Sequence, residues 1–209
     1  MRLAIFGATG GTGLELTRQA LEKGHSVRVL LRNPNRMPLS NDNMRIVLGS
    51  VLDHESVVKT ILGSDAVLSC LGQGTNLLRN THVVSVGTHL IMSVMKEQGV
   101  RRLVVESASG AGESIAQASL FQRLIFSTLL HAPYEDKNLM EPDVKASGLE
   151  WTILRPTRLT NGQRTGRYTV SVGTAPRTFS VTRADVATVM LRSAEEGLWI
   201  GEAPTVTAA

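Results

Sequence analysis

The sequence predicts an α/β protein built on a single, doubly wound parallel sheet with helices on both faces. Two observations carry this prediction. Short apolar runs alternate with segments of helical periodicity, which is typical of parallel strands joined by right-handed crossovers. A glycine-rich stretch, GATGGTG, also stands directly between the first apolar run and the first helical segment. No internal repeat or change in composition marks a second domain, so residues 1–209 are expected to fold as one unit.

The expected strands are short runs rich in Val, Ile and Leu. Six of them form the predicted sheet: Leu3–Phe6, Val27–Leu31, Met44–Leu48, Ala66–Leu71, Leu103–Val105 and Trp151–Leu154. Two further short strands, Tyr168–Val172 and Thr178–Val181, are expected on either side of a turn-forming Gly-Thr-Ala-Pro stretch.

The expected helices show apolar residues at three- and four-residue steps, and glycines end several of them. They are Thr12–Lys23, Val51–Leu62 with Asp53 as its N-cap, Thr81–Gln98, Asn138–Ser147 interrupted by Pro142, and a last helix from Thr182 to Glu196. Thr182 and Asp185 have the spacing of a capping box at the start of the last helix, which predicts a structural role for both.

Composition and charge narrow the class of protein. Of the 209 residues, 42% are hydrophobic and 19% charged, the balance of a soluble globular domain. The net charge of +4 comes without a basic run, so nucleic acid is not an expected partner. No stretch has the length of a membrane helix and no leader precedes the first strand, which predicts a cytoplasmic protein without membrane contact. The single cysteine, Cys70, lies in an apolar run and is expected to be buried, and no residues have metal-ligand spacing.

The glycine-rich stretch has the GxxGxxG spacing of a Rossmann-type dinucleotide-binding turn. Gly7 permits a sharp turn out of the strand, Gly10 lets the backbone approach a diphosphate, and Gly13 lets the helix pack on the sheet. The N–H groups and positive dipole end of the helix then face the phosphates. A tight turn without a ligand is the alternative, but the strand–turn–helix context favours a dinucleotide. The expected binding residues are Gly7, Thr9, Gly10, Gly11, Thr12 and Gly13.

The end of the second strand indicates which dinucleotide is bound. NAD sites place Asp or Glu there for the adenine ribose, yet no acidic residue occurs from His25 to Asn41. Arg32 closes the strand and Arg36 follows one turn later, and guanidinium groups suit the 2′-phosphate of NADP. Two solvated surface arginines are the alternative. The missing acid favours NADP(H) as the cofactor.

The absence of one motif reduces the number of reactions that the chain is expected to catalyse. Typical short-chain dehydrogenases use a Tyr-x-x-x-Lys dyad, in which the lysine lowers the tyrosine pKa for proton transfer. Here Tyr134 is followed four residues later by Asn138, and Tyr168 by Val172. The absent dyad counts against alcohol dehydrogenation and sugar-nucleotide epimerisation. Little chain remains after the sixth strand for the substrate domain of an epimerase or dehydratase.

Six stretches carry a family resemblance: FGATGGTG, LLR at residues 30–32, RRLVVESAS, SGLEWTILRP, TGRYTVSV and VTRADVA. Together they resemble the atypical short-chain dehydrogenases with an NAD(P)H-binding fold, and most closely the biliverdin-IXβ reductase/NADPH-flavin reductase family. The resemblance covers nearly the whole chain. SGLxWTxLRP together with TGxYTV is its more specific part, because the glycine motif is widespread.

The resemblance implies an NADPH enzyme that passes hydride to a planar conjugated acceptor, which is a flavin and in some members a linear tetrapyrrole or a quinone-like compound. It implies a pocket serine that matches Ser109, for which a turn or N-cap role is the alternative. Thr157 stands where tetrapyrrole-reducing relatives have a pocket histidine. This departure counts against tetrapyrrole reduction more than flavin reduction, because a reduced flavin takes its proton from solvent.

Further cofactor contacts are implied at the carboxyl ends of the strands. Relatives carry Asp where Ser50 stands, so weaker recognition of the adenine is expected. Gly72 is expected to let the backbone pass close beneath the adenine ribose. The residues of this set are Ser50, Val51, Cys70, Leu71, Gly72, Ser107, Pro156 and Thr157.

The segment Gly110–Pro133 is where relatives differ most and where a substrate would be covered. Phe121 and Arg123 are expected substrate contacts together with Ser109 and Thr157, since an aromatic ring stacks on a flat acceptor and a guanidinium attracts a phosphate or carboxylate. A helix packed into the core or at a dimer contact is the alternative, because apolar residues recur here at helical spacing.

The sequence thus predicts an NADPH-dependent oxidoreductase that reduces a flavin or a similar conjugated small molecule, with Ser109 and solvent assisting. The alternative is a non-catalytic NADP(H)-binding redox sensor that resembles the NmrA-like proteins, in which cofactor occupancy changes a partner surface. A monomer and a homodimer are both compatible with the sequence.

Overall fold

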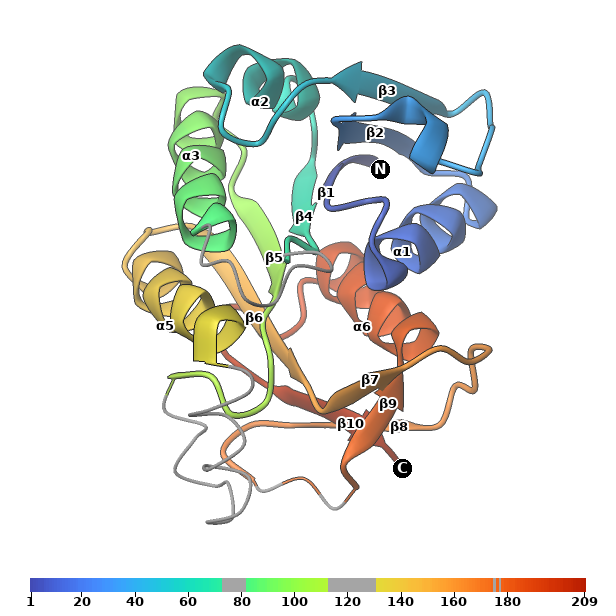
Figure 1. Ribbon diagram of the computed structural model, residues 1–209, viewed down its shortest axis with the longest axis vertical. Helices are drawn as coiled ribbons and strands as arrows, with labels where there is room; N and C mark the ends of the chain where they lie inside the picture. Colours follow the sequence, from blue (N-terminus) through green and yellow to red (C-terminus); the bar gives the residue numbers. More distant parts are fainter. Residues whose placement is uncertain (73–81, 113–130, 175, 177) are drawn as a thin grey trace.

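The structure, a computed structural model, describes residues 1–72, 82–112, 131–174, 176 and 178–209. Its strands are β1 (Arg2–Phe6), β2 (Ser26–Leu31), β3 (Met44–Leu48), β4 (Ala66–Ser69), β5 (Arg102–Glu106), β6 (Glu150–Pro156), β7 (Arg158–Thr160), β8 (Tyr168–Ser171), β9 (Ser180–Thr182) and β10 (Thr205–Ala208). Eight of these described strands form one sheet in the order β3-β2-β1-β4-β5-β6-β10-β8 (Figure 1). Strands β7 and β9 pair separately in parallel.

The helices cover both faces of the sheet. They are α1 (Gly11–Glu22), α2 (His54–Ile61), α3 (Val83–Glu97), α5 (His131–Lys145) and α6 (Arg183–Glu196). Helices α1 and α6 pack on one face with Ile5 of β1, and α2, α3 and α5 pack on the other with Phe6 (Figure 1). Successive strand residues point to opposite faces, so each strand supplies both cores. The predicted doubly wound α/β fold is confirmed.

The strand order places a topological switch between β1 and β4. Chain connections run outward from β1 through β2 to β3 on one side, and from β4 to β6 on the other. At such a point the loops that leave the carboxyl ends of the strands diverge and open a crevice, where ligands of open α/β sheets bind. The glycine-rich turn follows β1 and therefore lies at this crevice.

Three features of the second half depart from the sequence prediction. Helix α5 begins at His131 instead of Asn138 and continues through the exposed Pro142, whose carbonyl accepts the Ala146 N–H at 3.0 Å. Strands β7 and β10 were not expected, because each has a single large apolar residue between polar ones and so lacks the apolar run by which the other strands were predicted. Strand β8 runs antiparallel to β10, whereas the other described strand pairs are parallel.

Two predicted helix caps are confirmed. The Asp53 carboxylate accepts the Ser56 N–H at 2.9 Å and begins α2, and the Thr182 hydroxyl accepts the Asp185 N–H at 3.0 Å and begins α6. Asp185 also accepts hydrogen bonds from Thr165, at its N–H (2.9 Å) and its hydroxyl (2.7 Å). Its structural role is therefore to fasten the loop between β7 and β8 to the start of α6. None of the described helices combines the length and apolarity needed to cross a membrane.

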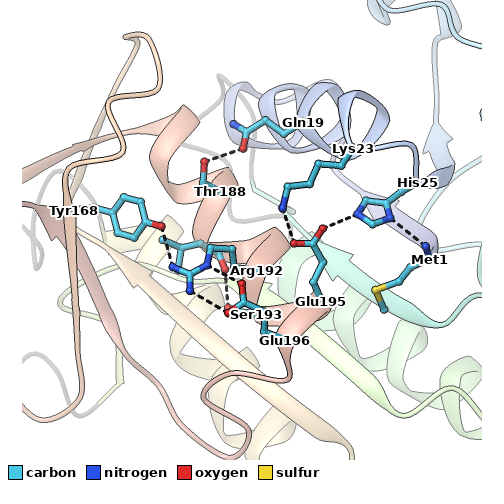
Figure 2. Close-up of polar contacts among 11 residues, drawn as sticks. Met1, Gln19, Lys23, His25, Tyr168, Thr188, Arg192, Ser193, Glu195 and Glu196 are labelled. Carbon is cyan, nitrogen blue, oxygen red and sulfur yellow. Dashed lines mark hydrogen bonds and ion pairs between the residues drawn. The ribbon is translucent and has the colours of Figure 1, made fainter.

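A polar cluster ties the end of α1 to the end of α6 (Figure 2). Glu195 lies 2.7 Å from Lys23 Nζ and 2.6 Å from His25 Nε2, and the other ring nitrogen of His25 lies 3.1 Å from the α-amino group of Met1. Burial raises the pKa of Glu195, but the hydrogen bonds from Lys23 and His25 outweigh it and leave this pKa below its ordinary value. The charged carboxylate is therefore the form that stabilises the fold.

We expect Glu195→Gln to lower the free energy of unfolding by about 1–2 kcal/mol at neutral pH, because the charge-assisted hydrogen bonds are lost. Since the folded-state pKa is depressed, this stabilisation is present above the ordinary pKa of 4.5 and disappears as the pH falls below it. Urea unfolding of both proteins at several pH values tests the expectation. A difference that persists at pH values well below 4.5 would contradict it.

Candidate functional site

The β1–α1 turn is shaped by contacts that leave no room for side chains. Gly7 has a φ of +75°, and a Cβ atom there would lie 2.3 Å from the carbonyl oxygen of Cys70, directly after β4. A Cβ atom at Gly13 would lie 2.2 Å from the carbonyl oxygen of Gly7. Close packing of the turn against β4 and α1 therefore requires glycine at both positions.

The N-terminus of α1 is open toward the crevice. Its N-cap is Gly10, which has no side chain to cap the helix, and no acidic residue occupies the first turn. Within the described residues, the N–H groups of Gly11, Thr12 and Gly13 donate to no protein acceptor. Unpaired N–H groups at the positive end of a helix form a binding site for an anion such as a diphosphate.

A cavity of about 290 Å³ lies beside this turn and is lined by Thr9, Arg32, Asn33 and Arg36. The Asn33 side chain accepts the Asn35 N–H at 3.0 Å and so begins the short 3-10 turn that carries Arg36. Both arginines are exposed, and neither has an ion-pair partner in the part of the chain that the structure describes. The structure thus brings together Thr9, Arg32 and Arg36, as a site for a 2′-phosphate requires.

Other predicted cofactor residues lie at the carboxyl ends of β3 and β4. The Ser50 hydroxyl accepts a backbone N–H of its own turn at 3.2 Å. Val51 is buried against α3, where a Cβ on Gly87 would lie 2.9 Å from a Val51 methyl group. Leu71 is half-buried, and Gly72 is exposed with open space at its Cβ position. No contact within the described protein requires a glycine at position 72.

Thr12 and Cys70 point into the protein. The Thr12 hydroxyl donates to Oε1 of Glu106 at the end of β5 (2.9 Å), so only the Thr12 backbone N–H faces the open helix end. Cys70 Sγ lies 3.5 Å from the sulfur of Met190. Cys70 is buried, as predicted, and burial raises the pKa of its thiol well above the ordinary value.

Helix α5 brings a tyrosine and a lysine to the carboxyl end of β5. The Tyr134 hydroxyl donates to the carbonyl oxygen of Ser109 at 2.9 Å, and Lys137 Nζ donates to the carbonyl oxygen of Ser107 at 2.6 Å. The two positions are three residues apart in the helix, so both side chains lie on one face of it. The Tyr-x-x-x-Lys motif is absent, yet a tyrosine and a lysine contact the same short segment.

The titratable groups at this end of the sheet have shifted pKa values. Burial raises the pKa of Tyr134 to about 12, so the phenol stays protonated at neutral pH. Burial lowers the pKa of the half-buried Lys137, although the carboxylates of Glu106 and Glu141 act in the opposite direction. Burial also raises the pKa of Glu106. A lysine and a glutamate whose pKa values move toward neutrality are typical of sites that transfer protons.

A buried ion pair holds α5 against β6. Arg155 Nε donates to Oε1 of Glu141 at 3.0 Å, and a second Arg155 nitrogen binds the other carboxylate oxygen. The Ser107 hydroxyl donates to the same Oε1 at 2.6 Å. The side chains of Arg155 and Glu141 are 5% and 1% exposed, so the pair is enclosed by protein. The Ser107 hydroxyl is thus used within the protein.

Ser109 and Thr157 lie on neighbouring strand ends but differ in what their hydroxyl groups do. The Ser109 N–H donates to the carbonyl oxygen of Pro156 at 2.8 Å, while its half-buried hydroxyl has no hydrogen-bond partner among the described residues. The buried Thr157 hydroxyl contacts the Val206 carbonyl and the Thr207 hydroxyl, both at 3.4 Å. Ser109 is therefore available to a ligand, whereas Thr157 joins β6 to β10.

Phe121 and Arg123, the other predicted substrate contacts, lie outside the described residues, as does most of the segment Gly110–Pro133. Within the described ranges, no three His, Cys, Asp or Glu side chains come together in the manner of a metal site.

Four residues at this edge were not predicted as site residues: Glu106, Tyr134, Lys137 and Arg183. Lys137 stands three residues after Tyr134, so the Tyr-x-x-x-Lys spacing does not include it. Positions three residues apart nevertheless share a helix face. Glu106 could have been identified from the sequence, because it is the one acidic residue that directly follows a predicted strand of the sheet. Arg183 directly follows the predicted N-cap Thr182, which places it at the start of α6.

Together these features define a Rossmann-type α/β protein with an open helix N-terminus and two exposed arginines at its switch point. The chain belongs to the NAD(P)H-binding family, whose sequence model matches residues 7–197. Among curated proteins it is similar to an uncharacterised chloroplastic protein of Arabidopsis thaliana, with 28% identity over 204 residues that cover 92% of this chain and 71% of that protein.

Solved structures share the fold. ChuY, an anaerobilin reductase from Escherichia coli O157:H7, superposes with a TM-score of 0.84 at 21% identity, covering 100% of this chain and 97% of that chain. A short-chain dehydrogenase/reductase from Veillonella parvula in complex with NADP superposes with a TM-score of 0.84 at 17% identity, covering 98% and 93%. At these identities the likeness concerns the fold.

Proposed function

We propose that this protein is an NADPH-dependent reductase that transfers hydride to a planar conjugated small molecule such as a flavin. The cavity of Thr9, Arg32, Asn33 and Arg36 carries the proposal, because it joins a site for a 2′-phosphate to the open N-terminus of α1. Membership of the NAD(P)H-binding family supports the cofactor class. The NADP complex of the Veillonella parvula protein and the reductase activity named for ChuY are consistent with it.

Different residues along the carboxyl edge of the sheet bind the cofactor and orient the acceptor. The first-turn N–H groups of α1 hold the diphosphate, and Arg32 with Arg36 holds the 2′-phosphate. NADPH, when bound, supplies a hydride to the acceptor. Ser109 lies across the switch point on the β5 side, where its unpartnered hydroxyl orients the acceptor or the cofactor carboxamide by a hydrogen bond.

Lys137 is the group that we assign to proton transfer. Its ammonium is held at the Ser107 carbonyl, two residues from Ser109, and burial has already lowered its pKa toward neutrality. A protonated amine with a lowered pKa gives up its proton readily to an acceptor that gains charge with the hydride. Tyr134, whose hydroxyl is bound to the Ser109 carbonyl, shapes the segment that carries Ser109.

The activity is tested by following NADPH oxidation with FMN, riboflavin, biliverdin and a simple quinone offered separately. Saturable turnover that is faster with NADPH than with NADH supports the reductase. Tight binding of both NADPH and NADP⁺ without turnover on any acceptor would contradict it and favour the redox sensor, in which the cofactor alone changes a partner surface.

Arg32→Ala is expected to weaken NADPH binding about ten- to hundredfold, since a hydrogen bond between charged groups contributes about 1.5–3 kcal/mol. NADH lacks the 2′-phosphate, so its affinity is expected to change little. Calorimetric titration of both cofactors measures the difference. Arg45→Ala is a matched control. Arg45 is exposed on β3, and its substitution removes the same charge from the protein. Equal losses for NADPH and NADH would mean that the 2′-phosphate binds elsewhere.

A further inference from the structure

Arg183 lies over the glycine turn. It is the first residue of α6, and a Cβ atom on Gly11 would lie 2.4 Å from Arg183 Cδ and 2.7 Å from its Nε. The stem of the arginine therefore crosses directly above the first residue of α1. A glycine at position 11 makes room for the Arg183 side chain. The requirement for glycine there therefore differs from that at Gly7 and Gly13, where the backbone of the turn leaves no room for a Cβ atom.

The guanidinium of Arg183 forms no ion pair with the described part of the protein. One terminal nitrogen donates to Oδ1 of Asn161 at 2.7 Å, and among the described residues no carboxylate lies within ion-pair distance. Arg183 is at the N-terminus of its own helix, where the dipole disfavours a cation, and beside the equally positive N-terminus of α1. Arg183 and the N-termini of α1 and α6 thus bring positive potential to one point, and no carboxylate of the described chain forms an ion pair with the Arg183 guanidinium there.

We propose that Arg183 binds the diphosphate of the dinucleotide, on its nicotinamide side, and closes the glycine turn from above. This role rests on the dinucleotide site proposed above. A guanidinium fixed at one nitrogen by Asn161 keeps further N–H groups for phosphate oxygens.

The position of Arg183 along the sheet indicates which of the two phosphates of the diphosphate it contacts. Arg32 and Arg36 mark the adenosine side at the end of β2, whereas Arg183 begins α6, which packs against β5. Its charge opposes the rise that burial causes in the pKa of Glu106 at the end of β5. In the strand order β2, β1, β4, β5, Arg183 is therefore on the far side of the glycine turn from the 2′-phosphate site.

Asn161 is a positioning residue in this arrangement. It begins the loop after β7, and Asp185 fastens the same loop through the N–H groups of Thr165 and Gly166, each at 2.9 Å. The loop is thereby held against the start of α6, and Asn161 is held against Arg183. The stretches TGRYTVSV and VTRADVA thus meet in one structural unit.

The test compares two ligands in calorimetric titrations with the full chain. 2′-Phospho-ADP-ribose carries both phosphates of the diphosphate, whereas 2′-phospho-AMP lacks the nicotinamide-side phosphate. We expect Arg183→Met, which keeps the stem over Gly11, to weaken 2′-phospho-ADP-ribose about ten- to hundredfold and to leave 2′-phospho-AMP almost unchanged. Arg167→Met, an exposed arginine after the same loop, is the matched control and should change neither affinity.

Gly11→Ala adds an independent measurement, because its Cβ would displace the Arg183 stem. We expect a selective loss for 2′-phospho-ADP-ribose in the wild-type background and a smaller loss in the Arg183→Met background, that is, non-additive effects. An unchanged affinity for 2′-phospho-ADP-ribose in Arg183→Met, or equal losses for both ligands, would overturn the assignment. Failure of the wild-type protein to bind either ligand would overturn the dinucleotide site itself. Neither result depends on the identity of the hydride acceptor.

Discussion

Replacing Arg155 with methionine is expected to lower the free energy of unfolding by about 3–5 kcal/mol, because the Glu141 carboxylate would remain buried without its cation. Both side chains are almost fully enclosed, and two hydrogen bonds join them. For a chain of this size, the loss corresponds to a decrease in Tm of about 6–20 °C. Urea unfolding, followed by circular dichroism, measures the effect.

Two further variants separate the buried charge from the lost packing. In Arg155→Met/Glu141→Gln the uncompensated charge is gone, while the amide oxygen still accepts the Ser107 hydroxyl, so most of the stability should return. Arg192→Met breaks an ion pair with Glu196 whose side chains are 40% and 45% exposed, and it should cost about 0.5 kcal/mol. If Arg155→Met cost no more than Arg192→Met, the interior pair would not stabilise α5 against β6.

The centre of the sheet was predictable because β1, β4 and β5 are buried on both faces. Runs such as Ala66–Leu68 are apolar without alternation, and the caps Asp53 and Thr182 have side chains that bond to the helix start. The continuity of α5 was not predictable in the same way, since Pro142 resembles a helix breaker in sequence but is exposed and costs only one hydrogen bond. Strand β10 depends on its two neighbours, which lie far away in the sequence.

The arrangement that we propose for the cofactor was more predictable from the sequence than the group of residues around Ser109. Glycines, a missing acid and Arg32 lie close together in the sequence and have direct mechanical meanings, and the structure brings Thr9, Arg32 and Arg36 to one cavity. The groups around Ser109 come instead from β5 and α5, and their pKa values depend on burial that no local pattern encodes. Thr157 illustrates the same limit, because its contact with β10 appears only in three dimensions.

Lys137→Met is expected to lower kcat about 10²- to 10⁴-fold with the preferred acceptor, which is the range that general acid catalysis contributes. Lys96→Met, an exposed lysine of α3, is the control and should leave kcat unchanged. Both variants are expected to bind NADPH normally, since the contacts proposed for the 2′-phosphate and the diphosphate lie on other elements. A loss of binding with an unchanged kcat would contradict the assignment of Lys137 to proton transfer.

The dependence of kcat on pH distinguishes a proton donor from a residue that only supports the fold. Lys137 must be protonated to donate, and burial lowers its pKa below the ordinary value of 10.5, so activity should fall on an alkaline limb that begins below that pH. The Glu106 carboxylate raises the pKa of Lys137, so Glu106→Gln should move this limb to lower pH. In Lys137→Met the limb should disappear, because no group is left to titrate. A limb that survives in Lys137→Met would assign the proton to another group, and a limb that Glu106→Gln does not move would show that Glu106 has no influence on the donor.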